Sequence, residues 1–183
     1  MKEELTFITS HAKKAEELAL HLDFPVVHHK LDLPEIQSLD PVEVAAAKAK
    51  EAHRLLDRPV LVEDYSITFE ALGRLPGPLI KWFLQEMQAE GICRLLDNYQ
   101  TRRATARTCF ALCDKEGVHI FEGAIKGIIT TAPRGDRGFG MDAIFIPDGA
   151  TQTWGEMDIE DQITYSLRRI GLKKLETYLR TQD

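Results

Sequence analysis

The sequence predicts an α/β protein in which a mixed β-sheet is flanked by helices, and two observations carry this prediction. Residues 5–64 alternate strand, helix, strand, helix and strand, the order typical of α/β folds. Further along, two long apolar segments flank the turn-forming residues 114–117, a pattern that indicates an antiparallel hairpin. The 183 residues are 44% hydrophobic and 28% charged, the balance of one ordinary globular domain, here taken as 1–183.

The first elements follow from local patterns. They are a strand at 5–9, a helix at 12–22 with apolar residues at three- and four-residue spacing, a strand at 25–30, and a loop from 33. Asp40, Pro41 and Glu43 resemble an N-cap, N1 and N3 set, so a helix is expected to run from 41 to about 56. The Arg58-Pro59 pair ends it, and residues 60–64 form a buried strand that ends in acid.

The remaining elements are less regular. They are a rigid loop at 73–78, a helix at 79–87, strands at 104–113 and 118–130, a glycine-rich loop at 133–140, a short strand at 143–146, and a helical region at 159–179. Trp82 and Phe83 on the first of these helices are available to the core or to a dimer contact. The last helical region is expected to break or bend near Gly171.

Charge and composition exclude several classes of protein. Lys and Arg total 23 and Asp and Glu total 29, and this net charge of −6 argues against a nucleic-acid polymer as main partner. No apolar run approaches the roughly 20 residues that span a bilayer. The acidic N-terminus lacks the basic start of a signal peptide, and three cysteines read as reduced thiols, so a cytoplasmic location is expected. Cys109 and Cys113 are interpreted as small buried hydrophobes rather than metal ligands.

Three short motifs carry possible chemistry. Residues 9–14 (TSHAKK) lie at a strand-to-helix turn, where backbone N–H groups and a lysine suit a phosphate. Residues 62–64 (VED) place a carboxylate at a strand end, and with Glu35 such a group can hold Mg²⁺. Residues 138–142 (GFGMD) combine flexible glycines with Phe139 as a flat face for a base and Asp142 as an acceptor. Taken singly, each motif is also compatible with a purely structural role.

Together these motifs resemble the inosine triphosphate pyrophosphatase family, the non-canonical purine NTP pyrophosphatases. The matching segments are 9–17, 32–35, 59–83, 133–147 and 156–157, in order and with compatible spacing. The resemblance implies a long mixed sheet with two lobes and a nucleotide-binding cleft, usually in a homodimer. It also implies Mg²⁺-dependent conversion of a nucleoside triphosphate to the monophosphate and pyrophosphate.

Residue by residue, the resemblance assigns roles. Asp64 becomes the metal-linked acid that activates water, and Glu35 the second metal ligand. Lys14, Lys48 and Lys81 would hold the triphosphate, a use that agrees with the charge of the substrate. The remaining positions expected at the substrate are Thr9, Ser10, His11, Tyr65, Phe139, Gly140, Met141, Asp142, Gln162, Ser166, Leu167 and Arg168.

Five of these positions depart from the family pattern. The family usually has Asn at His11, Thr or Ser at Tyr65, an aromatic residue at Met141, Lys at Gln162 and His at Leu167. The metal and most phosphate positions are kept, and the losses concentrate where the family reads and encloses the purine. We therefore hypothesise an NTP pyrophosphatase with altered base selectivity. The alternative is a degenerate paralogue that binds nucleotide without turnover.

Overall fold

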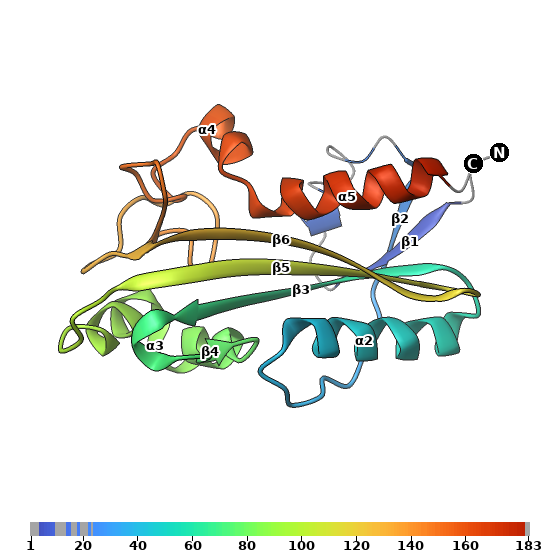
Figure 1. Cartoon of the computed structure of the whole chain (residues 1–183), viewed down its shortest axis with the longest axis horizontal. Coiled ribbons are helices and arrows are strands. Elements are labelled where there is room, and N and C mark those ends of the chain that lie inside the picture. The colour runs from blue at the N-terminus through green and yellow to red at the C-terminus, as the bar shows by residue number, and fades with distance from the viewer. Residues whose placement is uncertain (1–3, 10–13, 16–17, 19–21, 23, 182–183) are drawn as a thin grey trace. The chain divides into compact units, whose positions relative to one another are not determined.

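The computed structural model describes residues 4–9, 14–15, 18, 22 and 24–181. Its seven-stranded sheet has the order β2-β1-β3-β5-β6-β7, with β4 beside β3 (Figure 1). The strands are β1 (Leu5–Ile8), β2 (Val26–His29), β3 (Val60–Phe69), β4 (Pro76–Gly77), β5 (Arg103–Asp114), β6 (Gly117–Ile129) and β7 (Phe145–Pro147). The helices are α2 (Pro41–Leu56), the short η1 (Glu70–Leu72), α3 (Ile80–Leu95), α4 (Ile159–Thr164) and α5 (Leu167–Thr181).

The sheet is mixed, as predicted. β1 pairs in parallel with both β2 and β3, whereas β4 pairs antiparallel with β3 and β7 antiparallel with β6. β5 and β6 are neighbours joined by two residues, so they form the predicted hairpin. The last β1–β3 pair joins Ile8 to Val62, and therefore β3 continues beyond the carboxyl end of β1.

The chain separates into two compact units. One contains the described residues of 1–65, 108–123 and 168–183, and the other contains 66–107 and 124–167. The long strands β3, β5 and β6 contribute residues to both units. The predicted nucleotide-binding cleft stays a prediction.

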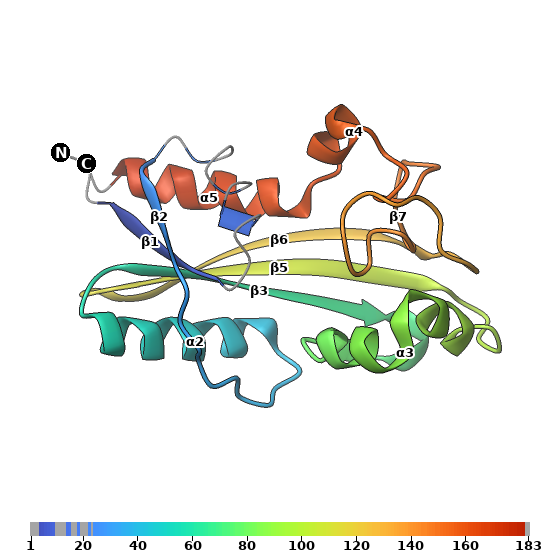
Figure 2. The ribbon, with the colours of Figure 1, turned by 180° about the vertical axis from the view of Figure 1, so that it is seen from behind.

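Within the first unit, α2 and α5 cover opposite faces of the sheet (Figures 1 and 2). Three alanines of α2 pack against Val60 and Val62 in one cluster that also contains Cys109 and Cys113. On the other face, Leu172 and Leu175 of α5 pack with Leu61 and Phe110. Because neighbouring residues of a strand point to opposite faces, β3 contributes side chains to the core on both sides of the sheet.

The start of α2 forms as predicted. The carboxylate of Asp40 accepts a hydrogen bond from the Val42 N–H at 2.9 Å, and Pro41 occupies the first helical turn. Cys109 and Cys113 are buried, as expected for small hydrophobes. Among the described residues, no helix is long and apolar enough to span a membrane.

Several boundaries differ from the prediction. β3 does not end at Asp64 but continues to Phe69, because Ser66, Ile67 and Phe69 are buried and extend the packed face. The helix expected at 79–87 is longer, and Gln88 with φ 55° separates its two segments. Trp82 is not in the core, since it is 55% exposed.

The C-terminal break also lies elsewhere. The chain leaves the helical path at Tyr165 and Ser166, between α4 and α5, whereas Gly171 lies inside α5. A Cβ atom at Gly171 would approach the Phe110 ring to 2.9 Å, so this glycine permits close packing of α5 on the sheet. Of the helix expected at 12–22, the structure describes Lys14, Ala15 and Leu18, which are helical, and Leu22, which is not.

Candidate active site

The candidate active site is built around two neighbouring carboxylates of β3, Glu63 and Asp64. Both lie just past Val62, which pairs with the last residue of β1. Ligands of open α/β sheets bind outside the carboxyl ends of parallel strands, and β1 has its carboxyl end here, although β3 continues past it. Strand alternation turns Asp64 toward the α2 face and Glu63 toward the α5 face.

On the α2 face, Asp64 meets a lysine and a second carboxylate. The Lys48 Nζ donates to Asp64 Oδ1 at 2.8 Å and lies 2.6 Å from Glu35 Oε1. Lys48 reaches this point because α2 packs closely on the sheet through buried Ala45, Ala49 and Ala52. The structure therefore brings together three of the predicted site residues, Glu35, Lys48 and Asp64.

Burial controls the ionisation of this pair. Desolvation raises the pKa of Asp64, and the attraction of Lys48 only partly opposes it. The pKa of Lys48 is raised, because desolvation is outweighed by its attraction to Asp64 and by hydrogen bonds to both carboxylates. Asp64 Oδ2 is buried and has no hydrogen-bond partner among the described residues.

On the α5 face, Glu63 lies between two cations. Its Oε1 accepts from Arg168 Nε at 2.6 Å and from the Thr108 hydroxyl at 3.0 Å, and its Oε2 lies 3.1 Å from Lys14 Nζ. Desolvation by itself raises the pKa of Glu63, but Arg168 and Lys14 outweigh it and lower this pKa to about 2. Glu63 is thus a buried anion, which sequence reasoning did not include in the site.

Other predicted residues lie in the second unit. Phe139 is 52% exposed, and its N–H donates to Asp142 Oδ2 at 2.8 Å. A Cβ atom at Gly138 would lie 2.0 Å from the same oxygen, so this turn requires glycine there. Gln162 donates from Nε2 to the Trp154 carbonyl oxygen at 2.9 Å.

The remaining predicted positions differ in accessibility. Met141 and Leu167 are buried, Ser166 is half-buried, Gly140 is exposed, and the exposed Lys81 has its Nζ 5.3 Å from the centre of the Trp82 ring. Thr9 follows β1, and its N–H donates to the His29 carbonyl oxygen at 3.2 Å. Tyr65 follows Asp64 in β3. Ser10 and His11 lie outside the described residues.

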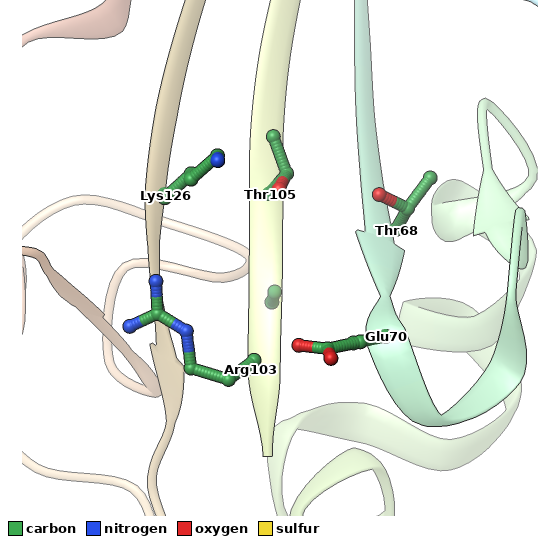
Figure 3. Close-up of a pocket in the computed structure, with 6 residues that line it drawn as sticks. Thr68, Glu70, Arg103, Thr105 and Lys126 are labelled. Atoms are coloured by element: carbon green, nitrogen blue, oxygen red, sulfur yellow. The ribbon is translucent and has the colours of Figure 1, made fainter. Parts of the chain in front are cut away.

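A separate polar pocket lies in the second unit, on the part of the sheet formed by β3, β5 and β6 (Figure 3). Its volume is about 410 Å³, and Thr68, Thr105 and Lys126 line it. Arg103, also in its lining, forms a bidentate ion pair with Asp148 at 2.6 and 2.7 Å. This pocket contains none of the predicted site residues.

Solved structures of other proteins share this architecture. The Ham1 protein of Staphylococcus aureus superposes with a TM-score of 0.87 at 22% identity, covering 99% of this chain and all of that one. A HAM1 protein of Coxiella burnetii superposes with a TM-score of 0.85 at 25% identity, over 97% of this chain and 98% of the other. The chain therefore has the fold of the Ham1 proteins.

The sequence comparisons identify the family. The Ham1 family model matches residues 5–178. Two proteins of Trypanosoma cruzi, named inosine triphosphate pyrophosphatase 1 and 2, are each 40% identical over 96% of this chain and 91% of their own length. The chain belongs to the Ham1 family, and its resemblance to inosine triphosphate pyrophosphatases is confirmed.

Proposed function

We propose that this chain is a Mg²⁺-dependent nucleoside-triphosphate pyrophosphatase, which converts a nucleoside triphosphate and water to the monophosphate and pyrophosphate. The observation that carries this proposal is the cluster of Asp64, Glu35 and Lys48, with Asp64 Oδ2 buried and unpartnered among the described residues. The names of the Trypanosoma cruzi relatives support the same reaction.

The residues present fit a magnesium ion. Asp64, with its unpartnered Oδ2, and the 45%-exposed Glu35 offer hard carboxylate oxygens, and both carboxylates contact the same Lys48 Nζ. The described residues contain no group of three or more His, Cys, Asp or Glu that could hold a metal. Two carboxylates suffice for Mg²⁺, because it keeps several waters and shares substrate phosphates. The ion, when bound, supplies charge for the triphosphate and a more acidic water.

Charge balance gives a physical reason for needing that ion. Glu35, Glu63 and Asp64 are opposed by Lys14, Lys48 and Arg168, so the described cluster is formally neutral. A neutral cluster has little net attraction for a tetra-anionic triphosphate. A divalent cation held by Asp64 and Glu35 would make the cluster positive. Lys14 and Lys48 would then orient the phosphates, and Asp64 would accept a proton from the attacking water.

We further propose that base selectivity differs from that of the family. Exposed Phe139 offers a ring face and Asp142 an acceptor, as in the motif that the family uses. Gln162 replaces a charged donor with a neutral amide, and buried Leu167 can make no side-chain hydrogen bond. A homodimer and a cytoplasmic location remain predictions.

The test is pyrophosphate release from a panel of triphosphates with Mg²⁺, comprising inosine, xanthosine, the eight standard nucleosides and modified bases. We expect turnover of at least one substrate, and D64N should lower it by 100-fold or more. D148N, which removes an exposed carboxylate from a different ion pair, serves as the matched control. Binding without turnover across the panel would instead support the degenerate paralogue.

A further inference from the structure

Glu63 is the most deeply buried carboxylate among the ion pairs described. Its side chain is 2% exposed, yet three side chains from distant parts of the sequence converge on it. Arg168 lies in the first turn of α5, Lys14 follows β1, and Thr108 belongs to β5. The two cations keep 18% (Lys14) and 23% (Arg168) of their side chains exposed. Glu63 therefore contacts them from the buried side, and part of each cation stays accessible to solvent.

Stability alone does not explain this arrangement. A buried ion pair loses much of its Coulombic gain to desolvation, and well-packed apolar residues often replace such pairs without loss. Leu61, two positions earlier on the same face, shows that this face accepts an apolar side chain. The carboxylate does one thing that an apolar residue cannot do, which is to fix the direction of two cations.

We propose that Glu63 is a positioning residue that orients Lys14 and Arg168 for the anionic nucleotide, acting through these two side chains rather than by touching the substrate. The Thr108 hydroxyl fixes the carboxylate by donating to the same oxygen that Arg168 contacts. The inference rests on the proposed function. It gives the two β3 carboxylates different roles on opposite faces of the sheet. Asp64 contacts Lys48 on the α2 face, and Glu63 positions Lys14 and Arg168 on the α5 face.

The experiment is a double-mutant cycle. E63Q keeps the shape and the Thr108 contact but removes the charge, and we expect kcat/KM to fall at least tenfold. In a K14M background the same change should cost less than threefold, because one side chain through which Glu63 acts is already missing. E51Q, which removes a carboxylate paired with Arg54 on α2, should remain within twofold of wild type.

Two results would overturn the proposal. One is E63Q with wild-type kcat/KM; the other is an equal fold-loss from E63Q in both backgrounds, which marks a role independent of Lys14. If E63Q fails to fold, as judged by its thermal unfolding, E63D decides. This variant keeps the charge with a shorter reach, so a tenfold loss at an unchanged Tm supports positioning and unchanged kcat/KM excludes it.

A binding arm separates this inference from the proposed function. If wild type releases no pyrophosphate from any triphosphate, the proposed function fails, and calorimetry with inorganic tripolyphosphate and Mg²⁺ then tests Glu63. A tenfold weaker affinity in E63Q than in wild type and E51Q supports positioning. Equal affinity in E63Q and wild type, or no binding by wild type, overturns it.

Discussion

Glu63 and Asp64 differ by one position in β3 and by one methylene group, yet their surroundings give them different ionisation. Burial raises the pKa of Asp64, with one lysine in direct contact to oppose it. Burial also acts on Glu63, but Arg168 and Lys14 together bring its pKa to about 2. The difference follows from the alternation of the strand, because each carboxylate meets the cations of a different layer.

The low pKa of Glu63 predicts an acid-sensitive stability. Its folded pKa, about 2, lies below its usual value of 4.5, so the unfolded chain takes up this proton first as the pH falls. The stabilisation is present above pH 4.5 and is lost between that value and about 2, by an amount on the order of 3 kcal/mol. Urea unfolding of wild type and E63Q across this range measures it. Equal slopes of stability against pH in the two proteins would contradict the prediction.

The proposed change in base selectivity predicts that restoring the family's residues at Gln162 and Leu167 brings the family's preference back. Q162K restores the family's charged donor and L167H its hydrogen-bonding ring, so the preference for ITP over ATP should rise. One recovered hydrogen bond is worth about 1–3 kcal/mol, or roughly one to two decades in relative kcat/KM. T164K adds the same charge to the exposed side of α4 and serves as control. If wild type already prefers ITP and XTP as strongly as the family does, the idea of altered selectivity is wrong.

At the scale of elements, α2 connects a local sequence signal to the site. Its N-cap, proline and small residues are all visible in the sequence, and the helix forms with the predicted bounds. Ala45, Ala49 and Ala52 allow the close packing that lets Lys48 reach Asp64. Local capping and small-residue spacing thus determine where one of the site lysines lies.

The N-cap of α2 predicts a measurable stability change. D40A removes the acceptor for the Val42 N–H, and losing such a cap costs about 0.5–2 kcal/mol. D40N keeps an acceptor and should remain near wild type. The free energy of unfolding from urea titration checks both variants. A D40A protein as stable as D40N would show that the cap contributes nothing here.

The sequence predicted elements with local signals better than elements set by long-range packing. The extension of β3 past Asp64 depends on burial of Ser66, Ile67 and Phe69. The sequence did not predict it, because the acidic residues at 63–64 were interpreted as the end of the strand. Gly171 suggested a break in the last helix, but it serves contact with Phe110. Glu63 was missed for the same reason, since its partner Arg168 lies 105 residues away.

At the scale of the whole molecule, the predicted residues divide between the two units. Glu35, Lys48 and Asp64 belong to the first, whereas the 138–142 turn and Gln162 belong to the second. The resemblance predicted both groups, because their motifs are contiguous in sequence. Which cations each carboxylate contacts could not be predicted, since that depends on which face each helix covers.

Ligand-dependent stability of the whole chain is the last prediction. The neutral charge of the described cluster implies that a triphosphate binds well only together with Mg²⁺. The α,β-methylene analogue of ITP at 100 times its Kd should stabilise the protein by about 2.7 kcal/mol, or about 5–11 °C in Tm for a chain of this size. Thermal unfolding with Mg²⁺ and with a chelator measures it, and D64N should lose most of the magnesium-dependent part. An equal shift without Mg²⁺ would refute the charge argument, and no shift with any triphosphate would leave the Ham1 fold here without a nucleotide site.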